Sequence, residues 1–66
     1  MEDIVAAIVN RKEETGMTWR EISKRSGVPY YTVLNWIYNR NIPRLDTLQW
    51  VLYALGMRLA LEKIED

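Results

Sequence analysis

The stretch TWREISKRSGVPYYTVLNWIY, residues 18–38, contains the start and stop signals of two short helices joined by a tight turn. Thr18 and Glu21 form a capping box, in which the threonine hydroxyl caps the first helix and the glutamate reaches back to the backbone of Thr18. Gly27 ends that helix because glycine adopts positive φ without a Cβ penalty, and Pro29 presets φ for the first turn of the next helix. The stretch therefore predicts a helix-turn-helix motif, with helices over residues 18–25 and 29–38.

Each of the two predicted helices has an apolar face and a polar face. The apolar positions that two crossing helices would share are Ile22, Val28, Val33 and Trp36 or Ile37. The positions outside this core are Arg20, Lys24, Arg25, Tyr30, Tyr31 and Asn35. One face of the motif is thus expected to pack, and the other to be available for binding.

The chain has 66 residues, enough for one domain over residues 1–66 and close to the lower limit for a single hydrophobic core. It contains no cysteine and no histidine, which excludes disulfides, cysteine-ligated metal and the usual general bases. Catalysis would need a pair of carboxylates in a pocket, and a bundle of this size has little room for one. We expect no cofactor, no metal site and no enzymatic activity.

No apolar run approaches the roughly 20 residues that cross a bilayer. Glu2 and Asp3 stand where a secretory signal would carry positive charge. We therefore expect a cytoplasmic chain with no membrane partner.

The formal net charge is zero, but the charges are unevenly distributed. Residues 18–44 carry five basic side chains against one acidic side chain, a net charge of +4, and the rest of the chain carries −4. A basic surface can be simply solvated, or it can bind phosphate. Its coincidence with the helix-turn-helix favours phosphate binding.

Two further helices are predicted to flank the motif. The first spans about residues 2–15, and its apolar positions are Ile4, Val5, Ile8 and Val9. After a loop over residues 39–43, another helix runs from residue 44 or 45 to residue 55, with apolar positions Leu48, Val51, Leu52 and Leu55. Gly56 supplies its C-terminal stop.

The tail over residues 57–63 alternates apolar and mostly polar residues, with Met57, Leu59 and Leu61 on the apolar side. This period of two predicts a half-buried strand. A lone strand has unpaired backbone groups, which the same strand of a second copy would satisfy across a two-fold axis. The alternatives are a mobile tail or a helix that continues past Gly56.

The spaced positions of the chain resemble the Cro/C1-type helix-turn-helix family of phage repressors and bacterial regulators. The matching residues are Gly16-Met17-Thr18, Glu21-Ile22, Ser26-Gly27-Val28, Thr32-Val33, Trp36, Ile42-Pro43, Thr47-Leu48 and Ala54-Leu55-Gly56. The resemblance implies an all-α bundle of four or five helices that binds double-stranded operator DNA, as a homodimer, to regulate transcription. The tail also resembles that of antitoxin-type members, whose C-terminal strand pairs across a dimer.

The resemblance implies roles for individual residues. Base reading falls on Tyr30, Tyr31 and Asn35, with Leu34 near the same surface. Asparagine can form two hydrogen bonds with adenine, and a tyrosine can meet a thymine methyl group or simply pack. Phosphate contacts fall on Thr18, Trp19, Arg20, Thr32, Arg40 and Arg44, although Trp19 could instead fold onto the core. Lys24 and Arg25 are expected to be solvated.

The chain departs from the family pattern at two places. Ser23 stands where the family usually has alanine, so its hydroxyl must bond back to a helix carbonyl or tolerate partial burial. Lys12 and Ile37 stand where many relatives have an ion pair, so apolar packing of Ile37 must replace that pair.

Two functions compete on the sequence alone. The first is a sequence-specific DNA-binding regulator, a repressor by its resemblance. The second is an antitoxin or adaptor that uses the same fold to bind a toxin or another protein, and exposed Trp50, Tyr53 and Met57 would be its signature.

Overall fold

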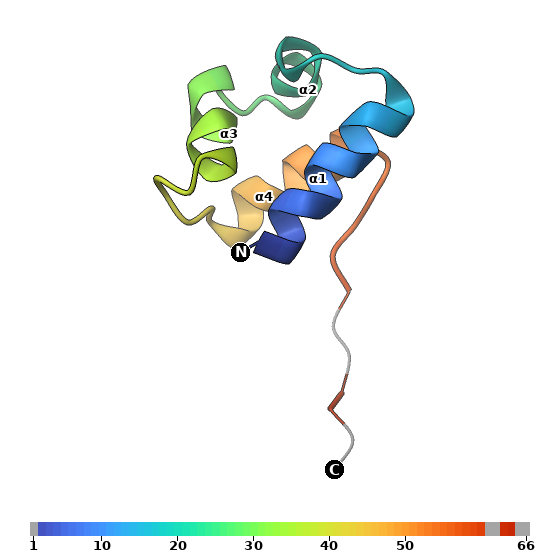
Figure 1. Cartoon of the computed structure of the whole chain (residues 1–66), viewed down its shortest axis with the longest axis vertical. Coiled ribbons are helices and arrows are strands. Elements are labelled where there is room, and N and C mark those ends of the chain that lie inside the picture. The colour runs from blue at the N-terminus through green and yellow to red at the C-terminus, as the bar shows by residue number, and fades with distance from the viewer. Residues whose placement is uncertain (1, 61–62, 65–66) are drawn as a thin grey trace.

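A computed structural model describes residues 2–60 and 63–64 of the chain. The described residues form an all-helical fold of four helices: α1 (Glu2–Thr15), α2 (Trp19–Ser26), α3 (Tyr30–Ile37) and α4 (Leu45–Ala54). Helix α2 packs against both α3 and α4, and α3 lies at the outer edge of the bundle (Figure 1). The all-α prediction is confirmed, with four helices in the described ranges. None of these helices has both the length and the apolar content that crossing a bilayer requires.

Helix α2 begins at a capped threonine, as predicted. Thr18 is extended, with φ −85° and ψ 161°, and its hydroxyl oxygen accepts a hydrogen bond from the Glu21 amide at 3.1 Å. The reciprocal bond differs from the expected one, because the Thr18 hydroxyl donates to Glu21 Oε1 at 3.3 Å. The glutamate therefore braces the capping hydroxyl and does not reach the Thr18 backbone.

The turn after α2 is held by the hydroxyl groups of two serines. Gly27 adopts φ +76°, the left-handed conformation that its place in the sequence predicted. Ser23 Oγ donates to the Val28 carbonyl at 2.6 Å, and Ser26 Oγ accepts from the Val28 amide at 3.2 Å. Ser23 is half-buried, one of the two expected alternatives, but its hydroxyl bonds forward across the turn and not back along α2. Both serines thus fix where the chain enters α3.

Helix α3 is one residue shorter at each end than predicted. Pro29 is its N-cap, with φ −54°, and Tyr38 is its C-cap. The next residue, Asn39, has φ +58°, which a helix cannot accommodate and asparagine tolerates. The helix therefore ends where the asparagine-rich loop was predicted to begin.

The core is entirely apolar within the described residues. Its members come from all four helices, from two connecting segments and from the C-cap of α4: Ile8, Met17, Ile22, Val28, Val33, Trp36, Leu48, Val51, Leu52 and Leu55. Of the two candidates at the end of α3, Trp36 is 3% exposed, whereas Ile37 is only partly buried against the core. Over residues 3–15 of α1, Ile8 alone is fully buried. Arg11 Nε donates to the Leu55 carbonyl at 2.8 Å, which ties α1 to the end of α4.

The predicted C-terminal strand is not found in residues 57–60 or 63–64, and these residues form no fifth helix. The Met57 amide donates to the Leu52 carbonyl at 2.8 Å and the Gly56 amide to the Tyr53 carbonyl at 3.0 Å, which is a Schellman cap. Met57 is therefore half-buried because the cap turns it onto the core, not because it belongs to a strand. Leu59 also packs against the core, and Leu61 lies outside the described residues. A strand needs a ladder partner, and the single chain supplies none to these residues.

Candidate nucleic-acid interface

Helix α3 has one buried face and one exposed face. Val33 and Trp36 are 0% and 3% exposed on the core side, whereas Tyr31 is 69% exposed. Asn35 is half-buried and lies four residues after Tyr31, so the two side chains share a face. Leu34 is also half-buried, beside this stripe. Three of the four predicted reading residues, Tyr31, Leu34 and Asn35, thus lie on one side of α3, and Tyr31 is the most exposed of them.

Tyr38 continues the stripe and was not among the predicted site residues. It lies seven residues after Tyr31, which places it on the same helical face, and its side chain is 65% exposed. The Arg40 guanidinium lies over its ring, with Cζ 5.8 Å from the ring centroid. The i, i+4, i+7 spacing of Tyr31, Asn35 and Tyr38 was the signal that could have found it.

Tyr30 is turned from this stripe toward α2. The Arg20 guanidinium lies over the Tyr30 ring, with Cζ 4.6 Å from the centroid. A stacked guanidinium keeps its N–H groups at the edge of its plane, so Arg20 can hold the ring and still donate to an anion. Tyr30 is therefore better placed to position Arg20 than to read a base beside Tyr31.

A hollow of about 350 Å³ lies on the α2 side of the first turn of α3. We call it the first hollow, and it is lined by Lys12, Thr18, Trp19, Arg20 and Tyr30. The lining residues carry two cations and no acidic group, so the first hollow suits an anion. Three predicted phosphate residues are thus brought together with Tyr30.

Lys12 joins this hollow from α1 and was missed as a site residue. Its Nζ lies 5.1 Å from the centroid of the Trp19 ring, a cation–π contact. Trp19 itself is half-buried and packs partly against the core, so it both packs and borders the hollow. Lys12 and Trp19 lie in different helices with a turn between them, so helical periodicity could not predict their contact.

A second hollow, of about 300 Å³, lies on the other side of α3. Its lining residues are Thr32, Trp36, Asn41, Ile42, Arg44 and Thr47. Arg44 Nε lies 3.5 Å from Asp46 Oδ1, and both side chains are largely exposed at 83% and 67%. An exposed ion pair of this kind contributes little to the stability of the fold, so Arg44 can exchange Asp46 for another anion at small cost in free energy.

The two hollows flank the same turn of α3 without sharing a lining residue. The first borders Tyr30 and the second borders Thr32. Arg40 is exposed in the loop after α3, beyond Tyr38. Cationic side chains therefore stand on both sides of the exposed face of α3. No group of three or more acidic side chains suited to a metal ion occurs in the described ranges.

Two of the residues predicted for a dimer contact, Met57 and Leu59, lie away from this face. Leu59 lines an apolar hollow of about 260 Å³ together with Leu45, Gln49 and Ala60. Leu45 is 69% exposed, so the apolar surface of α4 at this hollow is accessible to solvent. Met57 is half-buried beneath the cap of α4.

No family model, curated protein or solved structure matches the chain. Its resemblance to Cro/C1-type regulators thus stays a prediction drawn from spaced residues. The four-helix architecture and the geometry around α3 stand independently of that resemblance.

Proposed function

We propose that the chain is a sequence-specific, DNA-binding transcriptional regulator of the Cro/C1 type, with α3 as its recognition helix. The observation that carries the proposal is the stripe of Tyr31 and Asn35 on α3 and Tyr38 at its C-cap, with a cation-bearing hollow on each side of the helix. The major groove of B-DNA is about 12 Å wide and admits one α-helix, and its walls are phosphate backbones. A reading face flanked by two anion sites fits that shape.

Asn35 and Tyr31 are the residues that we assign to base recognition. A well-placed asparagine bonds adenine N6 and N7 together, and such a pair discriminates against a wrong base by about 1–3 kcal/mol. Tyr31 presents a ring to a thymine methyl group and a hydroxyl to a base edge or phosphate. Leu34 lies beside them and would contribute apolar contact.

Backbone contacts are assigned to the two hollows. Thr18, Arg20 and Lys12 would hold one strand, with Trp19 as the wall of the site. Thr32 and Arg44 would hold the other strand, with Arg40 beside them. These contacts fix register and orientation, and they carry no sequence information.

Repression as a homodimer is part of the proposal. The tail over residues 57–63 would pair with the same segment of a second copy, which would supply the ladder partner that the single chain lacks. Two copies of α3 would then enter successive major grooves, with half-sites about 10–10.5 base pairs apart. A fragment that ends at Gly56 should be monomeric in sedimentation at micromolar concentration if the tail forms the interface.

The test is selection of bound duplexes from a randomised pool at near-physiological salt, followed by binding measurements on variants. Asn35→Ala should weaken binding roughly 5- to 150-fold for each half-site of the selected sequence and relax preference at one base pair in each half-site. Asn10→Ala on α1 is the matched control and should bind as wild type, since Asn10 is exposed and far along the chain from α3. The proposal fails if no motif is selected, or if folded Asn35→Ala and Tyr31→Ala both bind the site as tightly as wild type.

A second candidate function is a protein-binding module such as an antitoxin. The observation that favours it is the exposure of Trp50 and Tyr53 on α4, at 57% and 49%. Met57, the third residue of that signature, is half-buried and fits it less well. A neighbouring gene that encodes a small toxin, and a stable complex between the two purified proteins, would favour this function.

A further inference from the structure

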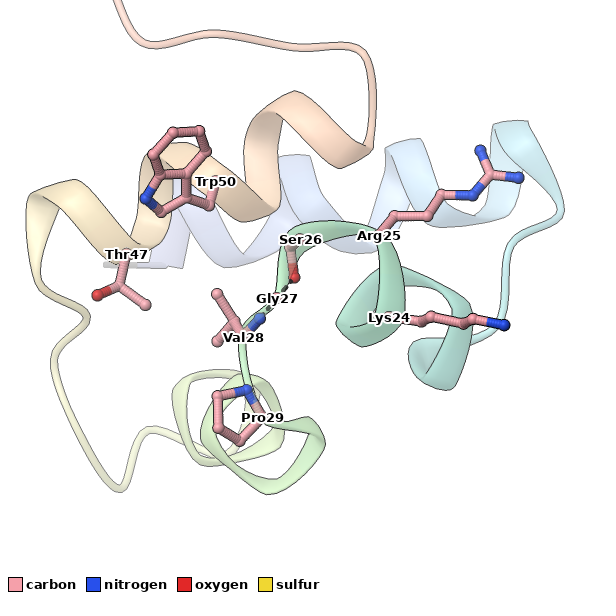
Figure 2. Close-up of a pocket in the computed structure, with 8 residues that line it drawn as sticks. All are labelled: Lys24, Arg25, Ser26, Gly27, Val28, Pro29, Thr47 and Trp50. Atoms are coloured by element: carbon pink, nitrogen blue, oxygen red, sulfur yellow. Dashed lines mark hydrogen bonds between the residues drawn. The ribbon is translucent and has the colours of Figure 1, made fainter.

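A groove of about 640 Å³ runs beside the turn of the helix-turn-helix, away from the reading stripe of α3. Its wall is formed by the end of α2, the turn itself and the exposed side of α4 (Figure 2). Lys24 and Arg25 lie at one end, Val28 and Pro29 in the middle, and Thr47 and Trp50 at the other end (Figure 2). We call it the turn groove. None of Tyr31, Leu34 or Asn35 lines it.

The exposed tryptophan at the apolar end of the turn groove is braced by its neighbours. The Trp50 ring meets the Tyr53 ring edge to face, with centroids 5.9 Å apart and planes at 75°. Gln49 Nε2 in turn donates to the Tyr53 hydroxyl at 2.7 Å, which holds that ring in place. Trp50 is nonetheless 57% exposed. A braced, exposed tryptophan loses little side-chain freedom on binding, which is the property of an interface anchor.

The cationic end of the turn groove has no countercharge of its own. Lys24 and Arg25 are exposed, and no lining residue of the groove is acidic. The ion pairs of the described residues join Arg11 to Glu14 and Arg44 to Asp46, and neither involves Lys24 or Arg25. An anionic partner group would therefore meet two positive charges without displacing an internal partner.

We infer that the turn groove binds an extended peptide segment of another protein, one with acidic residues next to an aromatic or large aliphatic side chain. The acidic residues would meet Lys24 and Arg25, and the apolar side chain would cover Trp50 and Pro29. A nucleic-acid backbone satisfies only the first half of this pattern, because it offers charge along its whole length and would leave the apolar end uncovered. The groove is shallow and open to solvent, which suits a peptide better than a small molecule.

The turn groove lies beside one proposed phosphate site and apart from the predicted reading residues. The groove shares Thr47 with the second hollow, so the two sites are neighbours, yet it excludes the predicted base-reading residues. The inference does not depend on DNA binding, since its residues and its test are separate from those of α3.

The experiment uses the full chain as bait for a library of random 12-residue peptides displayed on phage. The enriched peptides should share acidic residues beside an aromatic or aliphatic residue. Addition of one synthetic peptide from this set should shift the NMR signals of the Gly27 amide and the Trp50 indole N–H. The side-chain amide of Asn35 should stay in place.

Variants then test each end of the turn groove by calorimetry with that peptide. Trp50→Ala should lower the peptide affinity at least tenfold, and the double variant Lys24→Gln, Arg25→Gln should do the same while leaving the fold intact. Tyr31→Ala and Arg40→Gln are the matched controls, an exposed aromatic and an exposed cation on the other side of the motif. Both should keep wild-type peptide affinity.

Several results would overturn the inference. Peptides without acidic residues, or peptides insensitive to the groove variants, would show that the groove is not their site. A loss of DNA affinity in the Lys24, Arg25 double variant as large as that in Arg44→Ala would assign these cations to the DNA backbone. Conversion of a dimer to a monomer by Trp50→Ala would assign the groove to contact between copies of the chain.

Discussion

Replacement of Ser23 by alanine tests the bond that joins α2 to the turn. Ser23 Oγ donates to the Val28 carbonyl at 2.6 Å, and the hydrogen bonds of the described residues include no other donor to that carbonyl. Leaving a buried acceptor without its donor costs about 1–3 kcal/mol. Ser23 is half-buried, so water can partly replace the hydroxyl and the cost should lie toward the lower end.

A second effect of the substitution has the opposite sign. Ser23 lies inside α2, where alanine is a better helix former than serine by about 0.5 kcal/mol. The expected net loss in the free energy of unfolding is therefore about 0.5–2 kcal/mol. A domain of this size is stabilised by about 3–5 kcal/mol in total, so the loss is a substantial share. Each kcal/mol should lower the melting temperature by roughly 4–8 °C.

Urea titration followed by circular dichroism measures this difference. Ser26→Ala is the matched comparison, because Ser26 makes two longer bonds, to the Ser23 carbonyl at 3.3 Å and from the Val28 amide at 3.2 Å. It should cost less than Ser23→Ala. Equal or greater stability of Ser23→Ala relative to wild type would refute the reasoning, since helix propensity alone would then account for the result.

Three further predictions concern the turn, the packing of α1 and the backbone contacts. Gly27→Ala should lower the free energy of unfolding by about 1–2 kcal/mol in thermal melts, because alanine is strained at a φ of +76°. An added Cβ would meet no atom within 4 Å, so no clash adds to this cost. Arg11→Met should cost about 1–2 kcal/mol in urea titration, since it removes a partly buried charged donor from the Leu55 carbonyl. Arg44→Ala should weaken DNA binding and reduce the slope of log K against log salt by roughly one for each subunit, measured by filter binding.

Each of these has a control within the chain. Gly27→Asn should recover part of the Gly27→Ala loss, because asparagine tolerates the left-handed region. Arg58→Met, at an exposed position, should stay within about 0.5 kcal/mol of wild type. Asp46→Asn should strengthen DNA binding, because it removes the carboxylate beside Arg44, and an unchanged salt slope in Arg44→Ala would remove that residue from the interface.

The features predicted correctly from the sequence are those that depend on a few adjacent residues or on one helical period. Thr18, Gly27 and Asn39 each mark a helix end through their own cap or φ, so no distant contact is needed to predict them. The four apolar positions predicted for the last helix recur at helical spacing, and all of them are buried, three within α4 and Leu55 at its C-cap. Local chemistry was therefore enough to predict the four helices, and also which face of α2, α3 and α4 is buried.

The features that the sequence did not predict depend on contacts between different helices and turns. Ser23 reaches the Val28 carbonyl only after the chain has turned, so the identity of neither residue predicts the hydrogen bond. Lys12 reaches Trp19 across the connection between α1 and α2. The alternation that begins at Met57 predicted a strand, but Met57 is placed by the cap of the preceding helix. A short period-two pattern cannot distinguish these two origins.

The three tryptophans stand in three different environments. Trp36 is 3% exposed in the core, Trp19 is half-buried against Lys12, and Trp50 is 57% exposed. An indole in an apolar core emits at shorter wavelength than one in water, and a dissolved quencher reaches an exposed ring more readily than a buried one. Fluorescence of Trp36 should thus report unfolding of the bundle, while quenching of Trp50 reports occupation of the turn groove. The chain carries its own optical reporters for stability and for binding, and neither requires an attached dye.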